Sequence, residues 1–493
     1  MKDRLNKTDF LRFLSCPNEF WLKLRMPLLF QTPTTLEYEH LREQGYAVER
    51  YVKKLEQFQP NEERSVDFQR VFQTNDLYAK SDIVVTNKET GILDIYEIKS
   101  SGSVKPEHLD DVSFQKIVAE RCGFSVGRCF VITMNGEYVR HGDIDPEQLF
   151  VIKDVTEDIL ALAPTTEDQI KAARAYADSE PVASLVDYCT DNKLDCRFIK
   201  LNFPNLPDYT VFDIAFLKND KRRELLSQGI VAITDVPDDF PLSKKQQVQV
   251  SAAKSGETMI DKQEIANRIE AWEYPLHFLD YETFAYAIPQ FEGVRPFQQM
   301  CFQYSLHTID RPGAAPRHSY FLSRGEDDPP RAMAESLRDA MSGGIGTVLV
   351  WYEAFEKTRN SEMAEMFPDL AEFFNEVNTK TYDLMKIFAD KLYIHPDFKG
   401  RSSIKKILPV LVPELKYTDL GIGDGLTATI SWYRAVKWDH MASADREQIF
   451  EDLEKYCELD TIAMVRIFEE LLATLDPAAR QCLSTSRRAS ALH

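Results

Sequence analysis

The sequence lacks the segments that would place it in or across a membrane. No apolar run approaches the roughly 18 residues of a membrane span, and the opening MKDRLNKTDF has no apolar core of a signal peptide. We therefore expect a cytosolic (cytoplasmic) protein with no membrane partner. The patterns G-x-x-x-x-G-K-[ST], G-x-G-x-x-G after a strand and G-x-S-x-G are also absent. The sequence thus supports neither ATP-driven translocation nor serine hydrolysis.

Basic residues are fewer than acidic ones, and the chain has few cysteines for its length. Lys and Arg number 59 against 79 Asp and Glu, which gives a net charge of −20. This balance argues against a chain that coats nucleic acid non-specifically, although a local basic groove is compatible with it. The eight cysteines are expected to be free thiols or metal ligands, because disulfides are rare in a reducing compartment.

The pattern along the chain predicts a mixed α/β protein of more than one domain. A chain of 493 residues, 44% of them hydrophobic, is too long for one ordinary core. Residues 1–215 mix helical and strand patterns and predict a first domain, and residues 216–272 read as a helical connector. Residues 273–480 begin with strands, continue as helices and predict a second domain. Residues 481–493 are polar and predict a frayed, flexible tail.

Acidic residues late in the chain predict a metal site. Asp280 and Glu282 lie two apart in the apolar and aromatic run HFLDYETFAY, and the alternation of a strand puts both side chains on one face. Glu356 follows the apolar strand TVLVW. Tyr456 and Asp460 lie four apart in YCELDTIAMVRIF, whose helical periodicity brings both to one face.

The same residue types suggest the chemistry of that site. Carboxylates around one cleft repel one another unless cations neutralise them, and hard oxygen ligands suit Mg²⁺ or Mn²⁺. A two-metal site can deprotonate a water for attack on phosphorus and stabilise the leaving oxygen, while a nearby tyrosine orients that water or helps to deprotonate it. The competing interpretation is a set of solvated surface acids.

This set resembles the DEDD exonucleases of the ribonuclease-H-like fold, in the subtype with a tyrosine before the last aspartate: Asp280-x-Glu282, Glu356 and Tyr456-x-x-x-Asp460. The resemblance implies a 3′–5′ exonuclease with Asp280 and Tyr456 as catalytic residues. Its metal ligands would be Asp280, Glu282, Glu356 and Asp460. The family usually has aspartate where this chain has Glu356, and Asp383 in KTYDLMKIF is the rival for that role.

A second constellation lies in the first region. Asp82 in YAKSDIVV precedes Glu97 and Lys99 in IYEIKSS, and the last two share one strand face. Two acids can hold Mg²⁺ against a scissile phosphate, and a neighbouring lysine can orient the water or stabilise developing charge. Gln115 on the following helix and Glu49 on an earlier one are supporting candidates. The alternative is a surface Glu-x-Lys pair on a hairpin.

These residues resemble the PD-(D/E)XK nucleases, particularly the RecB-like group that includes the CRISPR-associated iron–sulfur exonucleases. The resemblance implies that Asp82 and Glu97 bind one or two metal ions and that Glu97 and Lys99 take part in catalysis. Glu49 stands where the group has a histidine, and Ala119 stands where its Q-x-x-x-Y motif has tyrosine.

Cysteine positions extend this resemblance to a possible cofactor. In the iron–sulfur members one early cysteine joins three late ones as cluster ligands. Cys16, Cys189 and Cys196 match three of these positions, and Asn202 falls near the fourth. The resemblance therefore makes an iron–sulfur cluster a candidate cofactor with one ligand position unmatched.

The order of the two motif sets along the chain resembles that of a bacterial family that fuses the two nuclease types. It implies nucleic-acid processing in DNA repair or defence, on DNA or RNA, with single strands or 3′ ends of DNA as the expected partner and a helicase in trans as a further candidate. The loop KGRSSIKK predicts phosphate contacts or, alternatively, a solvated loop; its basic residues are Lys399, Arg401, Lys405 and Lys406. The competing hypothesis is a catalytically decayed, nucleic-acid-binding scaffold.

Overall fold

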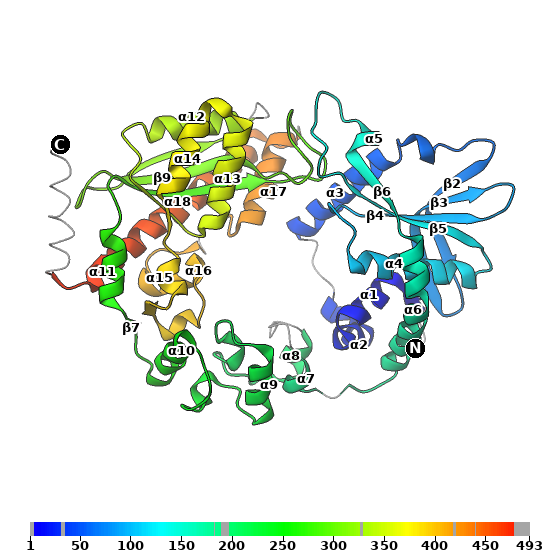
Figure 1. The fold of residues 1–493 in the computed structure, drawn as a ribbon, viewed down its shortest axis with the longest axis horizontal. Helices are drawn as coiled ribbons and strands as arrows, with labels where there is room; N and C mark the ends of the chain where they lie inside the picture. The colour runs from blue at the N-terminus through cyan, green and yellow to red at the C-terminus, as the bar shows by residue number, and fades with distance from the viewer. Residues whose placement is uncertain are drawn as a thin grey trace. The chain divides into compact units, whose positions relative to one another are not determined.

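A computed structural model describes most of the chain: residues 4–30, 35–181, 183–188, 197–325, 329–417, 421–438 and 440–477. It confirms the mixed α/β prediction and divides into two units (Figure 1). The first unit comprises Met1–Tyr188, Lys193–Pro204 and Ala285–Gln298. The second comprises Cys189–Asn192, Asn205–Phe284 and Gln299–His493. Within the described ranges, no helix is both long and apolar enough to cross a membrane.

The first unit is built on a six-stranded mixed sheet with the order β1-β3-β4-β5-β6, in which β2 also pairs with β3. The parallel pairs are β1 with β3 and β4 with β5. The strands are β1 (Leu5–Asn6), β2 (Arg64–Gln73), β3 (Leu77–Asn87), β4 (Leu93–Ile98), β5 (Val126–Met134) and β6 (Phe150–Asp154). The helices are α1 (Lys7–Ser15), α2 (Pro17–Arg25), α3 (Leu36–Val52), α4 (Pro106–Arg121), α5 (Pro146–Leu149), α6 (Thr156–Ala177), α7 (Leu185–Tyr188) and α8 (Arg197–Asn202).

The core of the first unit forms where α4 packs on the sheet. Helix α4 is buried over most of its surface, and the ring of Phe114 stacks on that of Phe10 from α1 at 4.9 Å between centroids. Strands β3 and β4 form an antiparallel pair in which Ile83 faces Tyr96. This register brings Asp82, one residue before Ile83, beside Glu97.

A segment from much later in the chain completes the first unit. Residues 285–298 bring Ala287 and Ile288 into a buried cluster that also contains Val48 of α3. The guanidinium of Arg140 donates to the carbonyl oxygens of Pro289 (3.2 Å) and Gln290 (2.7 Å). The core of the first unit therefore includes residues that, in the sequence, lie between two strands of the second unit.

The second unit contains a five-stranded mixed sheet with the order β10-β9-β8-β11-β12. Strands β8, β9 and β10 pair antiparallel, whereas β11 runs parallel to both β8 and β12. The strands are β8 (Leu276–Phe284), β9 (Met300–Ile309), β10 (Arg317–Leu322), β11 (Thr347–Val350) and β12 (Thr381–Asp383), with β7 (Met259–Ile260) and β13 (Tyr393–Ile394) forming a separate pair. The helices are α9 (Asn219–Ser227), α10 (Lys244–Ser255), α11 (Lys262–Glu270), α12 (Pro329–Ala340), α13 (Glu353–Met366), α14 (Ala371–Lys380), α15 (Lys386–Ala389), α16 (Ile404–Leu411), α17 (Gly425–Lys437) and α18 (Ser443–Thr474).

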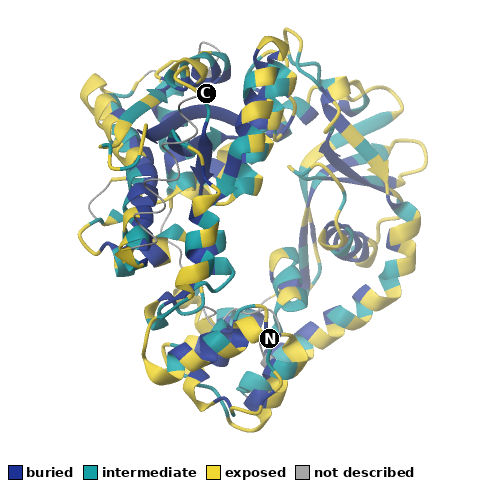
Figure 2. Ribbon diagram, turned by 60° about the vertical axis from the view of Figure 1, so that its left-hand side comes forward, coloured by how far each residue is buried: buried dark blue, intermediate teal, exposed yellow. Residues whose placement is uncertain are grey.

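The strands of the sheet are buried between helices whose outer faces are exposed (Figure 2). Along β8, successive side chains alternate between the two faces of the sheet and so pack into two separate cores. Leu279 and Tyr281 pack with residues of α12, α13 and α14. Phe278 packs on the opposite face with Met464 and Phe468 of α18. Because side chains two residues apart share a face, the acids of β8 face α18.

Candidate active sites

Three acids meet on the face of the sheet that α18 covers. Asp280 and Glu282 come from β8 and Asp460 comes from α18, and one carboxylate oxygen of each lies within 4.8 Å of the others. Asp280 is half-buried, while Glu282 and Asp460 are 7% and 8% exposed. The acids predicted from the strand pattern and from the helix pattern thus lie in one cluster, which we call the acid cluster.

Burial and mutual repulsion favour protonation of these carboxyl groups. Burial, and then the charge of Asp460, raises the pKa of Asp280 well above its ordinary value. Burial, and then the charges of the other two acids, does the same to the pKa of Glu282. Burial also raises the pKa of Asp460 to about 6. A divalent cation among these oxygens would counter both effects.

Glu356 lies next to the acid cluster. It occupies the first turn of α13 and is 2% exposed. Burial, followed by the charges of Asp280 and Glu282, raises its pKa well above the ordinary value. Its Oε2 atom is buried and has no hydrogen-bond partner within the described ranges. A buried, unpaired carboxylate oxygen is costly, so this atom fits the role of a metal ligand.

Asp383 has a different environment. Its Oδ1 accepts hydrogen bonds from the backbone N–H groups of Tyr352 (3.1 Å) and Met385 (3.0 Å). Tyr352 immediately precedes α13 and has a φ of 89°, a sparsely populated conformation for a residue other than glycine. Asp383 therefore fixes the start of the helix that carries Glu356, and Glu356 is the one that lies by the acid cluster.

Two tyrosines and a lysine complete the surroundings of Asp460. The Tyr417 hydroxyl donates to Asp460 Oδ1 at 2.5 Å. Tyr456, which shares α18 with Asp460, is 4% exposed, and burial followed by the charge of Asp460 raises its pKa strongly. The Lys405 ammonium lies 5.4 Å and 5.5 Å from the ring centroids of Tyr417 and Tyr456. Tyr417 carries no motif spacing, so no sequence pattern pointed to it.

The segment KGRSSIKK is a loop only as far as Ser403, contrary to the prediction, because α16 begins at Ile404 and carries Lys405 and Lys406. Its other basic residues have different surroundings from Lys405. Lys399 lies 3.6 Å from the carboxylate of Asp208, and Arg401 lies 3.8 Å from that of Asp213. Lys406 is exposed. The prediction from the sequence did not distinguish the four basic residues, but the structure places Lys405 beside the two tyrosines of the acid cluster.

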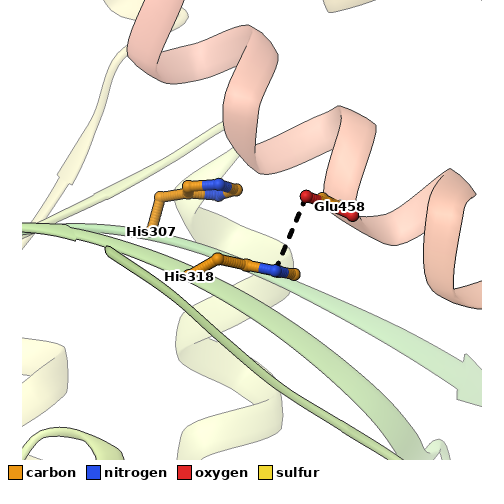
Figure 3. A group of neighbouring side chains, drawn as sticks. All are labelled: His307, His318 and Glu458. Atoms are coloured by element: carbon orange, nitrogen blue, oxygen red, sulfur yellow. Dashed lines mark ion pairs between the residues drawn. The ribbon is translucent and has the colours of Figure 1, made fainter. Parts of the chain in front are cut away.

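A histidine pair lies on another part of the contact between the sheet and α18 (Figure 3). The rings of His307 on β9 and His318 on β10 stack at 4.5 Å, and His318 Nδ1 lies 3.6 Å from a carboxylate oxygen of Glu458. Burial, and then the neighbouring His318, lowers the pKa of His307 to about 4. His307 Nδ1 lies 2.8 Å from Thr461 Oγ1. Because Thr461 follows Asp460, this hydrogen bond helps to fix the acid that α18 contributes.

The first unit brings its predicted residues together as well. Glu97 is 2% exposed, and the Lys99 ammonium donates to its Oε1 at 2.8 Å. Asp82 Oδ2 accepts from the N–H of Ile98 at 2.9 Å, which holds Asp82 against β4. Burial, followed by the charges of Asp82 and Asp111, raises the pKa of Glu97 to about 7.

Two further charged residues belong to this group and were missed in the sequence. The Lys7 ammonium lies 2.9 Å from Glu97 and 3.3 Å from Asp111, which also accepts from Lys99 at 2.6 Å. Gln115 Nε2 donates to Glu97 (2.7 Å) and Asp111 (2.8 Å). Asp111 precedes Gln115 by one helical turn, which was a usable signal. Lys7 arrives through the parallel pairing of β1 with β3, which local patterns do not predict.

Glu49 lies at the edge of this group. Together with Asp82 it lines a pocket of ≈ 280 Å³. Gln69 Nε2 lies 3.2 Å from Asp82 Oδ1 and 3.5 Å from Glu49 Oε1, so it connects the two acids. Gln69 has a φ of 57°. A strained residue that holds two candidate site residues is typical of functional regions.

The structure describes two of the four positions that the resemblance implies for an iron–sulfur cluster. Cys16 precedes α2, and its Sγ accepts the N–H of Glu19 at 3.4 Å. The N–H of Arg197 donates to the carboxylate of Glu19 at 3.1 Å, so the start of α8 lies beside α2. Asn202, at the fourth position, donates to a backbone carbonyl. Two predicted ligands fall outside the described residues: Cys189 and Cys196.

Comparison with known proteins adds sequence similarity without an assigned activity. Residues 277–403 match the model of a family described as a domain of unknown function (DUF2779). The match includes Asp280, Glu282 and Glu356 and ends before Asp460. The chain is also 26% identical over 229 residues to an uncharacterized protein of Ureaplasma parvum serovar 3, which covers 42% of this chain and 33% of the relative. The match thus spans about a third of that relative's length.

Proposed function

We propose that this protein is a metal-dependent nuclease whose acid cluster removes nucleotides from the 3′ end of a nucleic-acid strand. The observation that carries the proposal is the convergence of Asp280, Glu282 and Asp460, whose oxygens lie within 4.8 Å of one another. The sheet supports it, because β8 pairs with β9 of an antiparallel hairpin on one side and with the parallel strand β11 on the other, as expected for a ribonuclease-H-like fold.

The donor set fits Mg²⁺ or Mn²⁺. All of its atoms are carboxylate oxygens, which such hard cations prefer, and Glu356 adds the unpaired Oε2. Asp280, Glu282 and Asp460 would hold the metal, with Glu356 as a further ligand. When bound, the metal would lower the pKa of a water and stabilise charge on the phosphate.

The surrounding residues orient the reacting groups. Tyr417 fixes Asp460 through its hydrogen bond. The raised pKa of Tyr456 keeps its hydroxyl protonated at neutral pH, so Tyr456 acts as a donor that orients a water or a phosphate oxygen. Lys405, beside both rings, supplies the positive charge for a phosphate of the strand.

We further propose a PD-(D/E)XK-type site in the first unit, with Asp82 and Glu97 as metal ligands. Burial by itself would lower the pKa of Lys99, but the charges of Glu97 and Asp111 outweigh it and raise that pKa. Lys99 therefore stays protonated and stabilises the negative charge that develops on the phosphate rather than removing a proton. Gln115 orients Glu97 through its hydrogen bond.

Degradation of end-labelled DNA and RNA, single- and double-stranded, with Mg²⁺ or Mn²⁺ tests both sites. Asp280→Asn should abolish metal-dependent laddering from 3′ ends, and Lys99→Ala should abolish any cleavage that remains. Glu458→Gln is the matched control, because it neutralises an acid of α18 that faces His318 instead of the acid cluster. Binding of every substrate without cleavage would contradict the nuclease proposal and favour a nucleic-acid-binding scaffold.

A further inference from the structure

A basic pocket of ≈ 340 Å³ lies in the second unit and is lined by none of the acids described above. Its lining includes one acid, Asp220, and an aromatic residue, Phe216, and its basic residues are Lys218, Lys221, Lys245 and Lys391. Four lysines and one acid are a marked local excess of positive charge on a chain whose net charge is −20. We call this the basic pocket.

Within the part of the chain that the structure describes, three of these four ammonium groups form no ion pair with a carboxylate. Lys391 donates to the carbonyl oxygen of Gly400 at 2.7 Å, and Lys221 donates to that of Pro241. Burial, followed by the charge of Lys245, lowers the pKa of Lys391 to about 8. Across the described residues, Lys245 alone of the four has an ion pair, with Asp390 at 2.8 Å. A bound anion would stabilise the charged form of Lys391.

Phe216 adds an exposed aromatic face to the positive charge. It is 95% exposed, which is unusual for so large an apolar side chain. Its φ is 55°, and Lys391 in the same lining has a φ of 64°. Such backbone conformations cost energy in residues other than glycine and gather at ligand-binding sites. The exposed ring offers a surface on which an unpaired base can stack.

The chain connects the basic pocket to the acid cluster. Lys391 bonds to Gly400, which lies within the KGRSSIKK loop. From this loop the chain continues into α16, whose first turn carries Lys405 beside Tyr417 and Tyr456. A hydrogen bond and a short stretch of chain thus link Lys391 of the basic pocket to Lys405 beside the acid cluster.

We propose that the basic pocket binds a single-stranded segment of the nucleic-acid substrate, with backbone phosphates on Lys218, Lys221 and Lys391 and a base on Phe216. This inference rests on the proposed nuclease function. A single strand is favoured over a duplex because only an unpaired base presents its face to an exposed ring.

Binding of a fluorescein-labelled deoxythymidylate oligomer, followed by anisotropy in EDTA, tests the inference. Phe216→Ala should weaken binding by about 5- to 150-fold, since a base stacked on an aromatic ring contributes this much, and Phe216→Trp should restore it. Lys218→Ala and Lys391→Ala should each reduce the salt dependence, log K against log [salt], by about 0.7. Lys262→Ala, on α11 of the same unit and 52% exposed, is the matched control and should leave both values unchanged.

A second measurement separates this inference from the nuclease proposal. The p-nitrophenyl ester of thymidine 5′-monophosphate is a single nucleotide and lacks the further phosphates and bases that the basic pocket would bind, so Phe216→Ala and Lys391→Ala should turn it over with Mn²⁺ as the wild type does. Unchanged oligomer binding in these variants, with turnover intact, would overturn the proposed role of the basic pocket and leave the nuclease proposal standing. Equal binding of a duplex, or no dependence on Phe216, would also overturn it. Absence of turnover with pocket-dependent binding would overturn the nuclease proposal and leave the pocket standing.

Discussion

Tyr417 donates a hydrogen bond of 2.5 Å to Asp460, the acid that α18 contributes to the acid cluster. The two residues come from different elements, and the bond orients the carboxylate within a group of like charges. It also opposes the effect of burial on the pKa of Asp460, which is about 6. This one hydroxyl thus influences both where the acid points and at what pH it ionises.

Replacing Tyr417 with phenylalanine removes that bond and should raise the pKa of Asp460 further. Its carboxylate would then form at a higher pH, so we expect weaker Mn²⁺ binding near pH 6 and recovery as the pH rises. Calorimetric titration with Mn²⁺ across this range checks the shift. Tyr320→Phe, on β10 and 51% exposed, should bind as the wild type does, and an unshifted profile in Tyr417→Phe would contradict the assigned role.

Glu356 and Asp383 should behave differently when each is converted to its amide. Glu356→Gln removes a candidate ligand and should weaken metal binding by roughly 10-fold or more. Asp383→Asn keeps an oxygen that can accept from Tyr352 and Met385, so metal affinity should change little while thermal stability falls slightly. Metal titration together with a melting curve distinguishes the two, and the reverse pattern would make Asp383 the ligand.

Metal-free protein should lose stability as the pH rises from about 4 to 7. The folded-state pKa of Asp460 lies near 6 against an ordinary 3.8, and that of Glu97 near 7 against 4.5. The folded state therefore binds more protons than the unfolded state, and the free energy of unfolding falls with pH, by about 3 kcal/mol for Asp460.

Added Mg²⁺ should reverse this loss, because a cation stabilises the ionised acids. Melting curves with and without Mg²⁺ at several pH values measure the effect. The variant Asp280→Asn/Glu282→Gln should show a weaker pH dependence and a smaller response to Mg²⁺. A wild-type melting temperature that rises steadily over this pH range would contradict the raised pKa values.

Lys7 should stabilise the first unit through Glu97 and Asp111. Burial by itself would raise the pKa of Asp111, but Lys99 and Lys7 outweigh it and hold that pKa at about 2. Lys7→Ala leaves the buried acids with one cation fewer, and because Lys7 is 23% exposed we expect a loss of about 2 kcal/mol. Chemical denaturation measures it. Lys171→Ala, from an exposed pair on α6, should cost at most about 0.5 kcal/mol, and an equal loss in both would refute the role of Lys7.

Local patterns were sufficient for the elements that carry the predicted residues. Alternation along β8 gave the shared face of Asp280 and Glu282, and helical spacing gave that of Tyr456 and Asp460. The meeting of these two pairs depends on which face of the sheet α18 covers. The sequence suggested it only through the resemblance to a nuclease family, because long-range packing leaves no short-range periodicity.

Residues that join a site through tertiary contacts alone could not be predicted. Tyr417 reaches Asp460 from the part of the chain between α16 and α17, and Lys7 reaches Glu97 through the pairing of β1 with β3. The basic pocket combines Phe216 with Lys391, which are far apart in the chain. The sequence grouped residues 216–272 as a connector, whereas the contact pattern assigns them to the second unit.

The position of residues 285–298 limits how the two units can be separated by recombination or by protein engineering. They leave the strand of Asp280 and Glu282 and supply Ala287 and Ile288 to the core of the first unit. A recombination breakpoint or expression boundary near residue 215 would therefore yield an N-terminal half with a gap in its core. The two units are expected to be gained and lost together instead of being exchanged as independent cassettes.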